Sequence, residues 1–256
     1  MMTRPAHGPD RMNENPYAAP QVEPIPAPNK ASGRFNSPYG PYRTVNGIGW
    51  AVMISLVLGS VAAVVQIFAL ASLNAANIRW ENDAEAESEV DRWIEISDSI
   101  SYAEVATFLV TVVLWGVWKN KSCKNAWLFQ SGKPALFRQS DQITPGWAVG
   151  WYFVPIANLW KPFQAMAFIR NQVSEHFKGG AIVGLWWAAW LVMNIGSRTL
   201  TRSNEVYTTE AANSYNQRLM IDSGLTIVAS ITAAILIFTL SRAQRDQAKA
   251  NNLITG

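Results

Sequence analysis

Four long runs of apolar residues, almost free of charge, set the pattern along this chain of 256 residues. Residues 44–78, 179–197 and 223–241 contain no Asp, Glu, Lys or Arg, and residues 99–118 contain only Glu104. Each run is close to the ~20 residues that a helix needs to cross the hydrocarbon of a bilayer. The runs are continuous rather than alternating, so they predict transmembrane helices and exclude the strands of a membrane barrel.

The pattern predicts an all-α integral membrane bundle of four transmembrane helices, at about residues 48–73, 101–118, 180–198 and 222–241. Only 15% of the residues are charged, against roughly 25% in an average soluble domain, which supports the same class of protein. The first run is too long, and begins too far along the chain, for a cleaved signal peptide. The membrane domain is therefore expected at residues 47–242.

Proline is concentrated ahead of the first apolar run. Residues 1–46 hold nine of the thirteen prolines and few large aliphatic side chains. Such a segment buries too little surface to offset the entropy of ordering it, so we expect a disordered Pro-rich cytoplasmic tail. Residues 243–256 are expected to form a second, short cytoplasmic tail.

The uneven distribution of lysine and arginine between the loops predicts the orientation. With four spans, sixteen basic residues lie on the side of both tails and of the 119–179 loop, and five lie on the opposite side. Both termini and this loop are therefore expected in the cytoplasm. Residues 81–98, on the opposite side, carry eight acidic residues. We expect a solvated acidic loop there, in preference to a cation site.

Residues 144–162 read TPGWAVGWYFVPIANLWKP and combine aromatic side chains with three prolines. The fifteen residues from Gly146 to Trp160 would make about 22 Å of helix, less than the ~30 Å hydrocarbon core. Pro155 also removes a backbone hydrogen bond. If the segment crossed, the basic residues would divide thirteen to eight, which weakens the charge bias.

We therefore expect a proline-broken re-entrant or interfacial helical element between helices 2 and 3, at about residues 144–178, on the cytoplasmic face. Whether residues 144–162 dip into the membrane or lie on it stays open. Aromatic side chains at headgroup depth and residues that start or break the element are its expected markers: Pro145, Gly146, Trp147, Gly150, Trp151, Pro155, Asn158, Trp160 and Pro162.

The residues after Pro162 predict an amphipathic surface helix, with Phe163, Met166 and Phe177 near one face. The basic residues Lys161, Arg170 and Lys178 would then meet anionic lipid headgroups, at about 1 kcal/mol each. The alternative is that the element only plugs the cytoplasmic end of the bundle.

Small residues recur four apart in several of the apolar runs, a spacing that lets two helix backbones approach closely. They predict helix packing faces in the first and third runs: Ser55, Gly59 and Ala63, and Gly180, Gly184 and Ala188.

The segments PGWAVGWYFVPIANLWKPFQAM, LWGVWKNKSCKNAW and GLWWAAWLVMNI closely resemble the multi-pass bacterial membrane proteins grouped as domain of unknown function 4328. The resemblance extends over about residues 48–241 and is most specific from Pro145 to Pro162. It implies a bacterial cytoplasmic (inner) membrane location and assigns no reaction. The family pattern falls on residues already named and on three others: Asn125, Trp187 and Trp190.

Residues suited to catalysis are scarce in this sequence. It lacks a His-Glu-x-x-His pair, a Walker loop and a nucleophile elbow, and it has only two histidines, His7 and His176. The single cysteine, Cys123, offers no metal-ligand spacing. Glu104 lies near the outer end of its run, where it can reach water. We expect no enzyme, cofactor, metal or nucleic acid.

Two functions from different classes remain. The first is a non-enzymatic binding or scaffold protein whose cytoplasmic surface, around Trp147–Lys161, docks lipid or a protein partner. The second is a small oligomeric transporter or channel, in which the break at Pro155 exposes backbone carbonyls to a solute. Polar residues within the apolar runs are few, which favours the first.

Overall fold

The structure, a computed structural model, describes residues 35–133, 143–177, 179–200 and 208–254. All regular secondary structure in these ranges is helical, which confirms the all-α prediction. Three long helices form the frame: α1 (Asn46–Trp80), α2 (Glu87–Ser131) and α6 (Thr209–Ala250). A further helix, α5 (Ile182–Leu200), is shorter.

Short elements connect these helices. The 3-10 turn η2 (Ala84–Ala86) joins α1 to α2. Between α2 and α5 the chain forms four short pieces in succession: α3 (Trp147–Gly150), η4 (Trp151–Phe153), η5 (Ala157–Leu159) and α4 (Lys161–Gln172).

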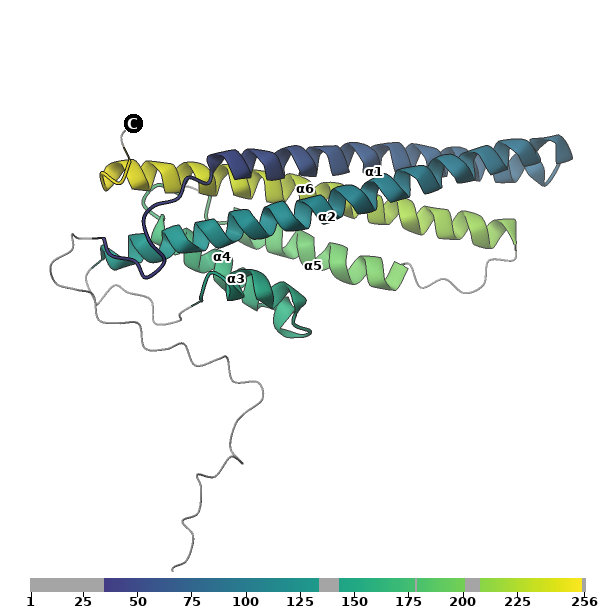
Figure 1. Ribbon diagram of the computed structural model, residues 1–256. Coiled ribbons are helices and arrows are strands. Elements are labelled where there is room, and N and C mark those ends of the chain that lie inside the picture. The colour runs from purple at the N-terminus through teal and green to yellow at the C-terminus, as the bar shows by residue number, and fades with distance from the viewer. Residues whose placement is uncertain (1–34, 134–142, 178, 201–207, 255–256) are drawn as a thin grey trace, which may run out of the picture. The chain divides into compact units, whose positions relative to one another are not determined.

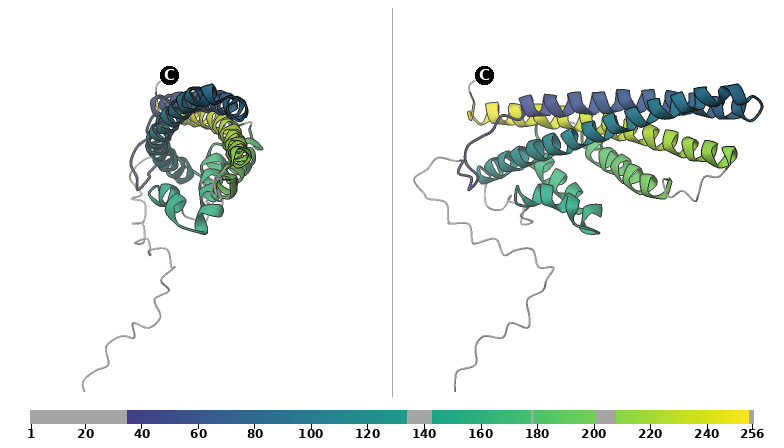
Figure 2. Two further views of the ribbon diagram at one scale, coloured as in Figure 1. Left: turned by 90° about the vertical axis from the view of Figure 1, so that its right-hand side faces the viewer. Right: turned by 45° about the vertical axis from the view of Figure 1, so that its right-hand side comes forward.

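Helix α1 lies between α2 and α6 and packs along both, while α5 packs against α6 (Figure 1). Helices α2 and α6 touch each other at few points. Seen end-on, α2, α1, α6 and α5 follow one another around the bundle, with α3 and α4 on the side between α2 and α5 (Figure 2).

Three helices are long and apolar enough to cross a membrane: α1, the continuous helix Ala84–Ser131 that contains η2 and α2, and α6. Helix α5 supplies a shorter apolar stretch, Ile182–Gly196. The apolar runs predicted to be helical are therefore helical in the structure, and their composition is compatible with membrane spans.

The long helices extend well past their apolar runs. The 45 residues of α2 make about 67 Å of helix, roughly twice the thickness of the hydrocarbon core. The acidic residues 81–98, predicted to form a loop, lie mostly in helix, because α2 begins at Glu87. An apolar cluster of Leu73, Ala76 and Val90, with Trp93 against it, gives this end a small core of its own.

Amide side chains join the helices near the same end. Asn77 donates to Asn213 at 3.0 Å, and Asn216 donates to Asn74 at 2.8 Å, so two amide pairs link α1 to α6. Gln66 of α1 donates to Ser97 of α2 at 2.9 Å. These contacts fix how the helices are aligned along their lengths, because the amides would lose their partners if one helix shifted by a turn.

Both predicted tails are shorter in the structure than expected. Residues 35–45 pack on the bundle, with Tyr39 against Trp127 and Tyr42 against Phe129. Helix α6 continues to Ala250, well beyond the expected start of a tail at residue 243. Apolar partners at this end of α2 explain the first difference, since aromatic burial offsets ordering entropy. Residues 1–34 lie outside the described residues.

The first small-residue face lies in a helix contact. Ser55 and Ala63 are buried, and a Cβ placed on Gly59 would come within 3.6 Å of Thr107 in α2.

The second small-residue face differs from the prediction. Gly180 precedes α5, and Gly180, Gly184 and Ala188 are exposed. The side of α5 that packs carries Val183, Trp186 and Trp187 instead. The indoles bury far more apolar surface than the small residues could, and that gain decides which side faces the bundle.

Candidate functional site

One face of α2 holds residues 144–162, which we call the proline-broken element. Trp127 Nε1 donates to the carbonyl of Ile143, just ahead of the element, at 2.9 Å. Asn120 donates to the carbonyl of Pro145 at 3.0 Å. Trp115 Nε1 donates to the hydroxyl of Tyr152 at 3.2 Å. The element therefore runs antiparallel to α2, from the level of Trp127 to that of Trp115.

After the proline-broken element, the chain runs back along α2 toward the end of the bundle at which the element began. The twelve residue steps of α2 from Trp115 to Trp127 correspond to about 18 Å of helix. After the element, α4 runs back along α2, because Lys119 contacts the carbonyl of Pro162 and Lys133 contacts that of Asn171. Residues 143 and 171 thus lie toward the same end of the bundle, and the segment between them is a hairpin.

Lys119 forms hydrogen bonds to both legs of this hairpin, the proline-broken element and the start of α4. It is fully buried, and its Nζ donates to the Tyr152 hydroxyl at 2.9 Å and to the Pro162 carbonyl at 3.1 Å. The same Nζ lies 4.4 Å from the centre of the Tyr152 ring. A buried lysine costs free energy unless its N–H groups are bonded, so these contacts both stabilise Lys119 and fix the element.

Aromatic side chains fill the space between α2, α5 and the element. Trp115 stacks on Trp186 with ring centres 5.4 Å apart, and Trp187 stacks on Trp190 at 4.8 Å. Tyr152 meets Trp190 edge-on at 5.8 Å. The two tryptophans that the family pattern marked, Trp187 and Trp190, thus belong to the packing that joins α5 to the element.

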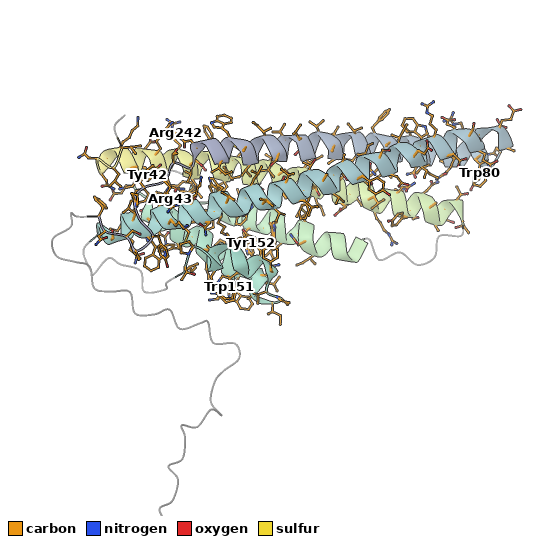
Figure 3. All side chains as sticks on the ribbon, in the orientation of Figure 1. Tyr42, Arg43, Trp80, Trp151, Tyr152 and Arg242 are labelled. Atoms are coloured by element: carbon orange, nitrogen blue, oxygen red, sulfur yellow. The ribbon has the colours of Figure 1, made fainter. Side chains whose placement is uncertain are left out.

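The tip of the hairpin is apolar and exposed. Phe153, Ile156 and Leu159 have exposed fractions of 71%, 73% and 48%, and Trp160 follows at 43%. Pro155 is exposed as well. Large apolar side chains therefore project from a segment whose base is hydrogen-bonded to α2, next to Trp151 and Tyr152, which are labelled in Figure 3.

The backbone at the tip is strained. Ile156 has φ 65° and ψ −57°, and the amide of Ala157 donates to the carbonyl of Pro155 at 2.7 Å. These values describe a γ-turn of the rare kind with positive φ. A β-branched residue in this conformation costs of order 1–3 kcal/mol.

Asn125 ties the start of the described chain to the bundle. Its side chain accepts from the Arg43 amide at 2.9 Å and donates to the Arg43 carbonyl at 2.8 Å, so it pairs with both backbone groups of Arg43. It also donates to Gln244 of α6 at 3.1 Å. Burial raises the pKa of Tyr42, the residue before Arg43, above its ordinary value.

The other predicted residues of the element lie at its base or its break. Trp147 and Trp151 face each other with ring centres 4.4 Å apart, and Trp151 and Tyr152 appear in Figure 3. A Cβ on Gly150 would come within 3.3 Å of the Trp147 ring. Of the remaining residues, Pro145 and Pro162 are buried and Gly146 is exposed. Asn158 is half-buried, and its buried Oδ1 has no hydrogen-bond partner among the residues that the structure describes.

The three predicted lipid-contacting cations have different surroundings. Lys161 Nζ lies 5.7 Å from the centre of the Trp151 ring, and no ion pair joins it to a carboxylate in the part of the chain that the structure describes. Arg170 is half-buried and donates to Asn171 Oδ1 from Nε at 3.1 Å and from Nη2 at 2.8 Å. Lys178 lies outside the described residues.

Helix α4 differs from the predicted surface helix. It ends at Gln172, and Met166 and Ile169 are fully buried, with only Gln164 exposed among its residues. It packs against α2 and α5. Helix α4 also packs against the proline-broken element, so it has little free surface.

Sequence reasoning missed the residues of α2 that hold the element. From the sequence, Lys119 counts only as one of the basic residues of the 119–179 loop, and Trp115 and Gly116 are not singled out. A Cβ on Gly116 would come within 3.3 Å of Val149, which shows how closely the element approaches α2. A signal was present, because Trp115, Lys119, Cys123 and Trp127 recur every four residues on one helix face.

The remaining chemistry is sparse in the described residues. No group of three or more His, Cys, Asp or Glu there could hold a metal ion. His176 contacts Gln247 at 2.9 Å, and Cys123 is buried against the Ile143 carbonyl.

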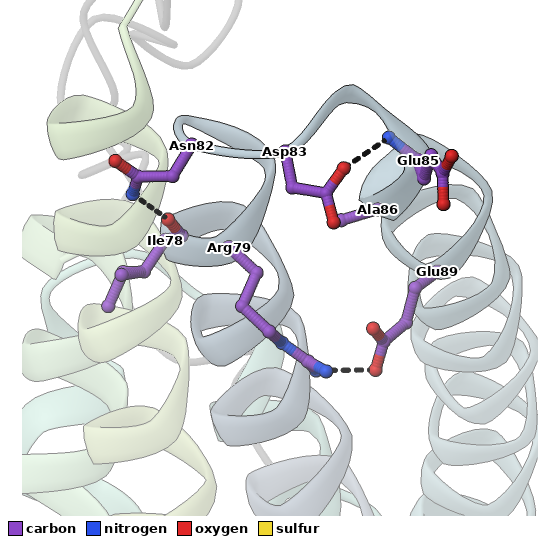
Figure 4. A pocket seen from close by; sticks show the side chains of 7 residues that line it. All are labelled: Ile78, Arg79, Asn82, Asp83, Glu85, Ala86 and Glu89. Atoms are coloured by element: carbon purple, nitrogen blue, oxygen red, sulfur yellow. Dashed lines mark hydrogen bonds and ion pairs between the residues drawn. The ribbon is translucent and has the colours of Figure 1, made fainter.

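A cavity of about 440 Å³ lies at the turn between α1 and α2, beside an ion pair of Arg79 and Glu89 (Figure 4). Asp83 also lines it and accepts from the Glu85 amide. The polar groups of this turn are thus engaged with one another, at the end of α2 far from the proline-broken element.

Comparison with known proteins identifies one family. The family described as domain of unknown function 4328 matches residues 79–242, which is more than half of the chain. The match includes α2, the proline-broken element, α4, α5 and most of α6. No match was found among curated proteins or among solved structures. The chain belongs to the family known as domain of unknown function 4328.

Proposed function

We propose that this protein is a non-enzymatic binding or scaffold protein of the bacterial inner membrane, and that the surface around Trp147–Lys161 docks anionic lipid headgroups. The observation that carries the proposal is Lys161, a cation beside an indole with no carboxylate partner among the described residues. Residues 142–174 contain no Asp or Glu at all. A site of this kind attracts phosphate groups, and tryptophan favours the same depth.

The proposed topology has four spans with both ends in the cytoplasm. Helix α5 has 19 residues, about 28 Å of helix, which nearly matches the hydrocarbon core. The contacts of Asn125 with Arg43 and Gln244 join the start of the described chain to the end of α6. Both observations support an even number of crossings, with the two ends of the chain on one side of the membrane. The excess of basic residues on that side favours the cytoplasm.

The lipid version is tested by replacing Lys161, Arg170 and Lys178 with glutamine. Phosphatidylglycerol retained by the purified protein in detergent is measured per mole of protein. At about 1 kcal/mol per cation, each loss weakens binding by about fivefold. Arg218→Gln, an exposed cation near the start of α6, is the matched control. Equal retention by the triple variant and the control would exclude lipid docking and leave a protein partner as the ligand of this surface.

A second candidate, a small oligomeric transporter or channel, is supported by Gln66. This side chain is 97% buried between helices, and its Oε1 has no hydrogen-bond partner among the described residues. Such an acceptor suits a passing water or cation. Saturable uptake by proteoliposomes that falls in Gln66→Leu would place transport ahead of docking.

A further inference from the structure

The tip of the proline-broken element has no cover from the rest of the described chain. Its four large apolar side chains, Phe153, Ile156, Leu159 and Trp160, are between 43% and 73% exposed. They lie within eight residues and form one apolar patch, which water would solvate poorly. We therefore expect something other than water or the described part of the chain to surround the tip.

The level of the tip along the bundle indicates what surrounds it. Tyr152, next to the tip, bonds Trp115 of α2 and packs on Trp190 of α5. Both tryptophans lie inside the apolar runs of their helices, not beyond their ends. At the same level α2 exposes Val113 and Val117, which are 65% and 41% exposed. The tip is thus level with the apolar outer surface of the helices.

The strain at Ile156 agrees with this placement. A glycine would adopt φ 65° without cost, yet the position carries a large β-branched side chain that points away from the bundle. Backbone strain of this kind persists where the side chain has a function that offsets its energetic cost.

The hairpin changes from apolar at its tip to basic just after the tip, which agrees with a tip that lies in an apolar environment. The apolar tip ends at Trp160, and the next residue is Lys161, level with Lys119 at the end of the apolar run of α2. A lysine at this point can reach the headgroups while the tip lies deeper.

We propose that the proline-broken element is re-entrant and that its tip inserts among the acyl chains of the cytoplasmic leaflet. The proposal rests on the sidedness of the proposed function and deepens it, because it names acyl chains as the partner of the tip and leaves the headgroups to Lys161. The occupant is lipid and not protein, since the patch is continuous in level with the apolar surface of α2.

The test places a spin label at residue 156. Ile156→Cys is made together with Cys123→Ala, which removes the buried native thiol, and the labelled protein is reconstituted in phosphatidylcholine vesicles. Collisions with oxygen, which concentrates in lipid, are compared with collisions with a water-soluble nickel complex. Labels at Val113 and at Ser174, both exposed, are the references for the apolar surface and for the turn after α4.

We expect the label at residue 156 to behave like the label at Val113, with oxygen collisions exceeding nickel collisions by several-fold. A label at Phe153 gives the same reading if Ile156→Cys fails to fold. Behaviour like that of Ser174 would overturn the proposal, since the tip would then lie in water. Protection from both reagents would also overturn it, because a protein would then cover the tip.

Lipid composition separates this proposal from headgroup docking. Acyl chains are present in vesicles of phosphatidylcholine alone and in vesicles that also contain phosphatidylglycerol. We expect the same oxygen preference in both, even if the glutamine variants show that anionic lipid does not bind. An oxygen preference that appears only with phosphatidylglycerol would overturn acyl-chain insertion and leave headgroup docking standing.

Discussion

Lys119 shows how a single buried lysine can hold a segment of backbone. Its two hydrogen bonds reach both legs of the hairpin, from Tyr152 on one side to Pro162 on the other. The carbonyl of Pro162, in the first turn of α4, can accept from Lys119 as well as from within the helix, because a carbonyl oxygen has two lone pairs. Lys119 therefore acts as a positioning residue for the tip.

Replacing Lys119 with methionine should destabilise the protein by about 1–3 kcal/mol, the usual cost of leaving buried hydrogen-bond partners unsatisfied. Methionine fills similar space, so the loss reports the hydrogen bonds and not a cavity. Thermal unfolding in detergent, followed by circular dichroism, measures the change. Lys121→Met, a half-buried neighbour on the same helix, is the control and should have little effect. Equal melting temperatures for the two variants would contradict the role of Lys119.

Ile156→Gly should stabilise the fold by about 1 kcal/mol, because glycine relieves the positive φ and recovers more energy than its own flexibility costs. Ile156→Ala removes the same side chain but keeps the strain, so it should give no such gain. The two melting temperatures are compared in detergent micelles. A gain in both variants would show that the isoleucine side chain, and not its backbone, was the source of the strain.

At the level of the elements, two glycines in apolar helices have opposite surroundings. Gly116 lies against Val149 of the proline-broken element, whereas nothing lies within 4 Å of a Cβ placed on Gly184 in α5. Within the described chain Gly184 has no packing neighbour, because small-residue spacing shows that close approach is permitted, not that a neighbour is present.

Gly116→Leu should cost about 1–3 kcal/mol by overpacking, while Gly184→Leu should stay within about 0.5 kcal/mol. Both substitutions put the same side chain into an apolar helix, so helix propensity cancels between them. Melting temperatures at low protein concentration provide the comparison. A large loss for Gly184→Leu, with a fall in apparent molecular mass, would show instead that this face of α5 packs against a second copy of the chain.

Across the whole molecule, the long helices place the polar contacts and the apolar runs at different levels. The amide pairs of Asn74 with Asn216 and of Asn77 with Asn213 lie at one end. Asn125, Lys119 and the hairpin lie at the other. This arrangement leaves the apolar runs between two polar regions, as expected for helices that extend past the bilayer on both sides.

The topology is tested by single cysteines at residues 85, 174 and 210 in a Cys123→Ala background. A membrane-impermeant maleimide should label residues 85 and 210 in intact spheroplasts, and residue 174 only after permeabilisation, because the hairpin returns to the cytoplasmic side. Labelling of residue 174 from outside would mean that the proline-broken element crosses. The four-span topology would then be wrong, and both proposals for the element would fail with it.

The sequence by itself determined the all-α class, the apolar helices and the extent of the proline-broken element. These follow from composition and from length along one chain, because about 20 apolar residues suffice for a span and a central proline interrupts one. The family also followed from local motifs, chiefly the one between Pro145 and Pro162.

Only the tertiary structure decided which residues hold that segment. Lys119, Trp115 and Gly116 are distant in sequence from the carbonyls and side chains they meet, so no periodicity in one segment could pair them. The same holds for residues 35–45, whose packing depends on aromatic partners in α2, and for α5, whose packed side depends on which neighbour offers the larger apolar surface. Which segments pack against each other depends on the three-dimensional structure. The sequence pattern shows only which side of each segment is able to be buried.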